Sequence, residues 1–291
     1  MSGTTRRRAT ATVTEAPAAR RTIPPRPRAT GWSRLPSVVR YLLLLGIFVG
    51  AWAAYASWSE FGQNDLLFAS PLETAQAFWD GWRDGSLADA TWQSLRILLL
   101  GVGIGAVIAV LFTVVATLTK VGEDALSLLT AIMNPLPGVA MLPLALLWFG
   151  LSTKAVLFTL ANATIWPIAI NLTSGFKTVN PTILAVGRNI GLSPVRLVSD
   201  VLAPAALPSA ITGLKTAWAF GWRTLIAAEL VFGVVGGEGG LGNYINNAKL
   251  YLFTPQMFAA LVTIALLGVI FEYAFTLLER RTIRKWGMQR S

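Results

Sequence analysis

Five charged residues interrupt the long apolar runs of this sequence: Arg96, Lys215, Arg223, Glu229 and Glu272. A charge inside a hydrocarbon layer is costly, so such a residue either pairs with an opposite charge or faces a water-filled route. Lys215 and Glu272 lie at matching depths in the last two apolar stretches, which predicts an ion pair between them. Arg96 and Glu229 both lie near the other ends of their stretches, and the same argument suggests a second pair.

Arg223 has no obvious partner at its depth, and two interpretations stay open. It could face a solute pathway and attract an anion. It could equally bond to the backbone carbonyls of a broken helix.

The usual groups of enzyme chemistry are scarce. The chain contains no histidine and no cysteine, which removes the commonest proton shuttle and the thiolate nucleophile. A phosphate-binding loop would have the pattern G-x-x-x-x-G-K-[ST], and no such run occurs. The glycine-rich "GVVGGEGGLG" at 233–242 lacks the Lys-Ser/Thr pair, so we interpret it as a flexible outer turn. We therefore expect no enzyme, no ATP hydrolysis by this chain, and no metal or other cofactor on it.

The composition indicates a membrane protein with many spans. Hydrophobic residues make up 54% of the 291 residues and charged residues only 13%, where a soluble domain carries about 25%. A span needs about 20 mostly apolar residues. The expected all-α domain covers residues 38–279, with six spans at about 38–58, 94–119, 125–149, 153–176, 207–232 and 255–278.

Arginine-rich tails flank this domain. The first 40 residues hold nine arginines and a single acid, Glu15. Residues 1–37 lack apolar periodicity and are predicted to be disordered. A signal peptide is the competing interpretation, but no clear cleavage site follows. A second basic tail covers residues 280–291.

The charges also predict the orientation, since cytoplasmic segments are rich in Lys and Arg. Both tails and the segment between the fourth and fifth spans are basic, whereas residues 59–91 hold six acids against Arg83 alone. With six spans, the basic regions fall on one side. We expect both termini in the cytoplasm of a prokaryotic cell and the acidic loop outside its plasma or inner membrane.

The outer loop and the third span each carry a local signal. Ser70, Pro71 and Glu73 predict a capped helix start. The amphipathic, Trp-rich helix that follows suggests a membrane anchor rather than a substrate site. In the third span, prolines break the helical pattern. This "NPLPG" stretch is a candidate gate or a packing kink, and it consists of Asn134, Pro135, Leu136, Pro137 and Gly138.

The polar segment of residues 180–204 has two helix starts. Asn180 can cap a helix that begins at Pro181, and Gly191 suits the left-handed residue that ends it. Ser193 and Pro194 repeat the start signal, so two short helices are predicted to meet at a turn. In the first helix, Ile183, Leu184, Gly187 and Ile190 are expected on one side.

This segment resembles the cytoplasmic coupling loop of permease subunits of binding-protein-dependent ABC importers. That family has Glu-Ala-Ala, three residues, Gly, and a Pro thirteen residues later. Gly191 and Pro204 have this separation, but Ala185, Val186 and Gly187 replace Glu-Ala-Ala, so the acid is missing. The resemblance implies that the ATPase-coupling residues are Ala185, Val186, Gly187, Arg188, Gly191, Leu192, Ser193 and Pro204.

The likeness covers nearly everything after residue 65. "LPGVAMLPLALLWFGLSTKA", "AAELVFGVVGGEGGLGNYINNA" and "LLERRTIRKW" resemble sulfonate-, nitrate- and taurine-type permeases in the family's order. This implies a type I importer fold that works with an ATP-binding subunit, an extracytoplasmic substrate-binding protein and a second permease copy or paralogue. ATP and Mg would bind the ATPase, and the solute would be a small anion or heterocycle. Membrane lipid but no nucleic acid is expected as a further partner.

The main alternative is a secondary transporter. Such a protein would need coupling-ion sites near the midplane between internal repeats. The sequence shows no convincing repeat and no central acidic cluster.

Overall fold

The computed structural model describes residues 35–58, 67–233 and 239–285, which are helical almost throughout and contain no strand. Most of the predicted disordered tail, residues 1–34, lies outside the described residues, as do residues 286–291. The elements are α2 (Ser37–Trp58), α3 (Pro71–Arg83), α4 (Ser86–Leu118), α5 (Lys120–Met133), η1 (Gly138–Met141), α6 (Leu142–Phe149), α7 (Thr153–Lys177), α8 (Pro181–Asn189), α9 (Pro194–Leu197), η2 (Val198–Leu202), α10 (Ala203–Ala205), α11 (Leu207–Phe232), α12 (Leu241–Leu250) and α13 (Thr254–Lys285).

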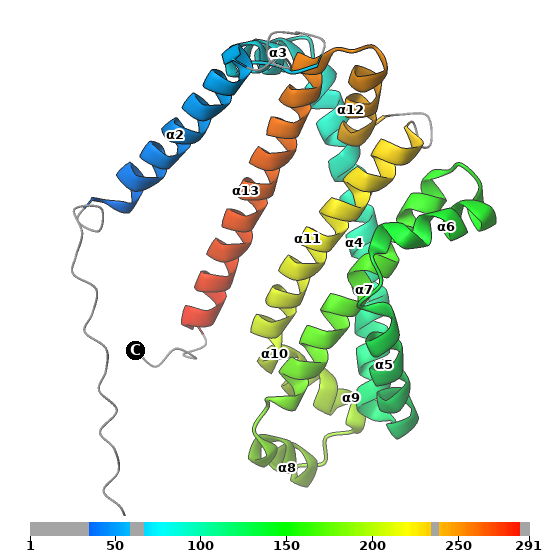
Figure 1. The fold of residues 1–291 in the computed structure, drawn as a ribbon. Coiled ribbons are helices and arrows are strands. Elements are labelled where there is room, and N and C mark those ends of the chain that lie inside the picture. Colours follow the sequence, from blue (N-terminus) through cyan, green and yellow to red (C-terminus); the bar gives the residue numbers. More distant parts are fainter. Residues whose placement is uncertain (1–34, 59–66, 234–238, 286–291) are drawn as a thin grey trace, which may run out of the picture. The chain divides into compact units, whose positions relative to one another are not determined.

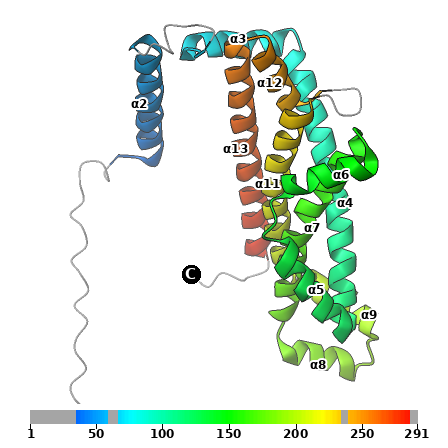
Figure 2. The ribbon, with the colours of Figure 1, turned by 45° about the vertical axis from the view of Figure 1, so that its right-hand side comes forward.

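From Val49 onward the chain forms one compact unit. In it α4, α7, α11 and α13 run along a bundle (Figures 1 and 2), and α7 packs against both α4 and α11. Both views place α8 at one end of the bundle and α3 and α12 at the other. We call these the α8 end and the α3 end.

Two apolar clusters hold the bundle together. One joins α4, α7, α11 and α12 through fully buried leucines, among them Leu98, Leu160, Leu225 and Leu241. The other joins α4, α5, α7 and α11 around Trp166. Because α7 contributes to both clusters, its middle is buried on nearly every side. It is therefore the central helix on which the others pack.

The number of spans agrees with the prediction when bent helices are counted as one. Four helices are long and apolar enough to cross a membrane, and two bent helix pairs raise the number to six. The predicted third span is one of these pairs, because α5 and the η1–α6 segment meet at 97°. The break that the prolines of this span predicted is present, between Met133 and Gly138. Pro135 and Pro137 lack the N–H that would continue the helix, and α5 ends at Met133 with Asn134 as its C-cap.

Two other boundaries differ from the expected spans. The second span begins at Ser86 instead of residue 94, and the last helix continues to Lys285 instead of ending near residue 278. Apolar length predicts the part of a helix inside the lipid, whereas polar turns that extend the same helix carry no such signal. The predicted start of α3 is confirmed, since Ser70 N donates to Glu73 Oε2 (2.7 Å) and Glu73 N donates to Ser70 Oγ (3.3 Å).

Candidate functional site

The polar segment after α7 consists of the two predicted short helices. Asn180 Oδ1 accepts a hydrogen bond from Thr182 N (2.9 Å) at the start of α8. Ser193 Oγ accepts from Arg196 N (3.3 Å) at the start of α9. Between them Gly191 has a φ of 83°, which is the predicted left-handed conformation. Caps at both starts and a glycine turn between the helices make this segment a defined element, not an irregular loop.

One side of α8 combines a buried glycine with exposed apolar side chains. Gly187 is buried, and a Cβ added there would lie 2.8 Å from Leu197 Cδ1. Ile183, Val186 and Ile190 are 52%, 54% and 71% exposed. Ile183, Gly187 and Ile190 lie four and three residues apart, so they share one side of the helix, as predicted. The two isoleucines and Val186 form an exposed apolar stripe on this side.

The remaining predicted coupling residues lie around this stripe. Ala185 and Arg188 are exposed, as are Ser193 and Pro204, while Leu192 is half-buried. Because Ala185 is exposed, the absent glutamate leaves no gap in the packing of this chain. A carboxylate at that position would lie on the outer surface of α8.

The predicted ion pair between Lys215 and Glu272 is formed, and it links α11 to α13. Lys215 Nζ also donates to Thr276 Oγ1 (3.4 Å). Lys215 is half-buried and Glu272 is largely exposed. The pair therefore lies at the edge of the bundle, where it neutralises two charges at membrane depth.

The second predicted pair, between Arg96 and Glu229, is not formed. Glu229 is 3% exposed, and its carboxylate accepts hydrogen bonds from Ser94 Oγ (2.9 Å to Oε1, 2.8 Å to Oε2) and from Gly242 N (2.9 Å). Ser94 Oγ in turn accepts from Leu241 N (2.9 Å). Ser94 and Arg96 lie two residues apart on α4, about 200° around the helix. When Ser94 faces Glu229, Arg96 must therefore point away, and it is exposed.

The glycines after α11 are closely packed where they are described. A Cβ added at Gly240 would collide with Glu229 and Ser94, and one at Gly242 would collide with Glu229 and Ile226. The interpretation of this stretch as a flexible turn is wrong for Gly239–Gly242, and residues 234–238 lie outside the described residues. Glycine is required here because the backbone approaches a buried carboxylate. Sequence reasoning missed Ser94, since a lone serine in an apolar run carries no signal of its own.

Arg223 lies in the interior of α11 with an exposed side chain. The neighbouring Thr224 is buried, and a Cβ added at Gly138 would lie 2.6 Å from its Oγ1. The helix break that contains Gly138 therefore crosses α11 one residue from Arg223. Neither an ion pair nor a side-chain hydrogen bond of Arg223 occurs among the described residues.

The predicted gate residues lie in this break. Asn134, Pro135 and Pro137 are exposed, whereas Gly138 is half-buried between Ala163 of α7 and Thr224 of α11. The break therefore consists of an exposed bend at the prolines and a tightly packed glycine after them. This geometry is compatible with either of the two interpretations left open by the sequence.

Solved structures share this fold. An inward-facing MetNI methionine ABC transporter matches with a TM-score of 0.54, covering 67% of this chain and 95% of that chain at 19% identity. A chain of an amino acid ABC transporter with histidines matches with a TM-score of 0.57, covering 70% of this chain and 98% of that chain at 18% identity. At these identities the likeness shows the fold alone.

Curated relatives are similar over most of their length. A permease of Escherichia coli (strain K12) named for aliphatic sulfonates transport, SsuC, is 31% identical over 85% of this chain and 91% of its own. The taurine transport system permease TauC of the same strain is 30% identical over 66% of this chain and 70% of its own. The nitrate import permease NrtB of Synechocystis sp. (strain ATCC 27184 / PCC 6803 / Kazusa) is 26% identical over 84% and 89%.

A family comparison covers most of the bundle. Residues 101–284 match the family described as the binding-protein-dependent transport system inner membrane component. This range starts within α4 and includes the helix break, α8 and the Lys215–Glu272 pair. The chain therefore belongs to this family and is a transmembrane permease subunit of an ABC importer.

Proposed function

We propose that α8 and α9 dock onto a separate ATP-binding subunit and transmit its movements to the bundle. The observation that carries this proposal is the exposed apolar stripe of Ile183, Val186 and Ile190 on a helix that is capped at its start and ended by Gly191. Apolar side chains at the end of a membrane bundle gain stability by burial in a protein cleft. A rigid helix linked to α7 and α11 can pass on rigid-body motion.

The remaining partners follow from this arrangement. ATP and Mg bind the ATPase subunit, and this chain hydrolyses no ATP. A substrate-binding protein delivers the solute at the α3 end, and a second permease copy or paralogue completes the pathway. The α8 end and both termini lie in the cytoplasm of a prokaryotic cell. This orientation is supported by the basic residues of the tails and of the coupling segment.

The proposed solute is a small anion of the sulfonate, taurine or nitrate type. The relatives named for such solutes support this class. Arg223 supports it independently, since an exposed guanidinium inside a span attracts negative charge to its face of α11.

Copurification with the ATPase subunit tests the docking role. The variant Ile190→Asp places a charge in the exposed stripe and is expected to reduce the amount of ATPase subunit recovered in mild detergent. Val121→Asp is the matched control, because Val121 is an exposed apolar residue at the start of α5, outside α8 and α9. Equal recovery with both variants would contradict the docking role. Solute uptake by the chain without any ATPase would instead indicate a secondary transporter.

A further inference from the structure

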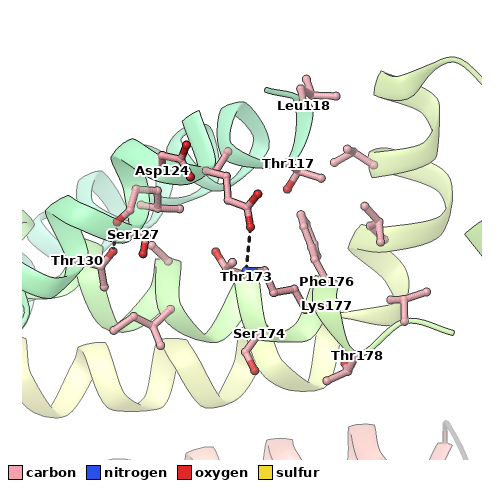
Figure 3. A pocket seen from close by; sticks show the side chains of 18 of the residues that line it. Thr117, Leu118, Asp124, Ser127, Thr130, Thr173, Ser174, Phe176, Lys177 and Thr178 are labelled. Carbon is pink, nitrogen blue, oxygen red and sulfur yellow. Dashed lines mark hydrogen bonds and ion pairs between the residues drawn. The ribbon is translucent and has the colours of Figure 1, made fainter. Parts of the chain in front are cut away.

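A cavity of about 1350 Å³ lies between α5, the last turns of α7 and the coupling segment (Figure 3). One wall carries Ser127 and Thr130 from α5, and another carries Thr173 and Ser174 from α7. The coupling segment contributes Leu184 and Arg188 among other residues. No role for this cavity follows from the permease function described above.

The acidic residues of the cavity are already neutralised. Glu123 pairs with Lys120 and with Lys177, each at 3.1 Å, and Asp124 pairs with Lys120 at 3.3 Å. The bond from Lys177 to Glu123 joins α7 to α5, and Figure 3 shows Lys177 and Asp124 beside the cavity. This cluster holds two positive and two negative charges. Arg188 is thus the one charged lining residue for which no ion pair is found among the described residues, and it gives the cavity a positive balance.

The hydroxyl groups are not equivalent. Thr130 Oγ1 donates to Leu126 O, and Thr178 Oγ1 donates to Gly175 O (2.8 Å), so both are satisfied within their own segments. Thr173 Oγ1 is buried and has no hydrogen-bond partner. An unpaired buried hydroxyl is costly. Rotation of the Thr173 side chain toward the cavity would let a ligand supply the missing acceptor.

We propose that this cavity binds an organic oxyanion, such as a sulfonate or a phosphate ester. The negative head of the ligand pairs with Arg188, and one of its oxygens accepts a hydrogen bond from the Thr173 hydroxyl. The apolar part of the ligand packs on Leu126, Ile170 and Leu184. Charge-assisted bonds of guanidinium to such heads are strong and directional. A free small solute and an anionic phospholipid share this chemistry, and the experiment below separates the two sources.

Occupation of this cavity has a consequence for coupling, and this step alone rests on the proposed docking of α8. A ligand here contacts Leu184 and Arg188 of α8 together with Ile170 of α7 and Leu126 of α5. If α8 takes up two positions relative to the bundle during transport, the ligand stabilises the position for which it has the higher affinity. Binding then changes ATP hydrolysis to the extent that the ligand's affinity differs between these two positions.

The test uses the permease with its ATPase subunit in nanodiscs, without the binding protein. The probe is 1-butanesulfonate, titrated by calorimetry into discs of phosphatidylcholine alone. Native mass spectrometry of discs that also contain phosphatidylglycerol measures retained anionic lipid. Arg188→Gln is expected to weaken binding by about tenfold and Thr173→Val by about threefold. Arg196→Gln is the matched control, since Arg196 lies in the same segment but does not line the cavity.

Sulfonate binding that both cavity variants weaken and the control does not would support a solute site. Retained phosphatidylglycerol with the same dependence would support a lipid site. Absence of both, or equal binding in all variants, would overturn the proposal. Saturable binding that leaves ATP hydrolysis unchanged would support the site and contradict only its link to the docking role of α8.

Discussion

Ser94 Oγ on α4 and Glu229 Oε2 on α11 lie 2.8 Å apart, and together they cap a third helix, α12. The first two N–H groups of α12 belong to Leu241 and Gly242, and they donate to Ser94 and Glu229 respectively. The preceding residue, Gly240, has no side chain to serve as a cap. Side chains of two distant helices therefore accept the hydrogen bonds of backbone N–H groups that a local cap usually accepts. These bonds hold α12 against the bundle at the α3 end.

Removal of the serine hydroxyl should destabilise the bundle. Ser94→Ala leaves the buried N–H of Leu241 without an acceptor, and we expect a loss of about 1–3 kcal/mol in the free energy of unfolding. Thr91→Val on the same helix is the control, because Thr91 Oγ1 is buried but has no hydrogen-bond partner. Chemical unfolding of the purified protein in detergent measures both variants, and similar losses for both would contradict the capping role.

The close approach of the backbone to Glu229 predicts a second effect on stability. Gly240→Ala should be strongly destabilising, because the added Cβ collides with both Ser94 and Glu229. Gly103→Ala is the control, since nothing lies within 4 Å of a Cβ added there and alanine favours the helix interior. A thermal unfolding assay should show a lower midpoint for Gly240→Ala and an equal or higher one for Gly103→Ala. The reverse order would disprove the packing argument.

The Lys215–Glu272 pair predicts a measurable coupling between two helices. In a double-mutant cycle with Lys215→Met and Glu272→Gln, we expect an interaction energy of about 1 kcal/mol. Exchange of the two charges should restore part of the stability that either single substitution loses. The same cycle with Lys249→Met in place of Lys215→Met should show no interaction. If exchanging the two charges restored no stability, the ion pair would contribute little to the stability of the protein.

Gly191 allows a test of coupling that leaves side-chain packing untouched. Nothing lies within 4 Å of a Cβ added there, so only its φ of 83° opposes substitution. Gly191→Val should therefore lower transport per ATP hydrolysed, whereas Gly191→Asn should be tolerated, because asparagine adopts this conformation more readily.

Gly85→Val controls for backbone strain as such. Gly85 has a φ of 85°, is equally open, and lies at the start of α4. Transport and ATP hydrolysis are measured together in proteoliposomes. The coupling role of the Gly191 turn would be contradicted if Gly85→Val also uncoupled transport from ATP hydrolysis, or if Gly191→Val left the coupling unaltered.

Arg223 predicts the charge preference of uptake. Arg223→Gln should lower uptake of a sulfonate by about tenfold through a higher KM, while Arg223→Lys should retain most of it. Arg96→Gln is the control, since Arg96 is also an exposed arginine within a predicted span. Transport assays in proteoliposomes measure all three variants. Unchanged uptake with Arg223→Gln would favour a structural role for this arginine.

The sequence by itself determined the features that arise from local chemistry. Apolar length predicts the spans, Asn180 and Ser193 predict two helix starts, and Gly191 predicts a left-handed turn. These signals are reliable because each depends on neighbours along the chain. The pairing of Lys215 with Glu272 was also predictable, since opposite charges at the same depth in apolar surroundings have few other partners.

Only the tertiary structure decided which face of each helix is covered. Arg96 was expected to pair with Glu229, but the rotation of α4 brings Ser94 to the carboxylate instead. The glycines near residue 240 suggested flexibility, but the close contact with Glu229 makes them a packing requirement. The proline break in the third span was foreseen, but not its angle of 97°. Side-chain identity sets the cost of burial, whereas helix rotation and crossing, which depend on the whole bundle, determine which side chains meet.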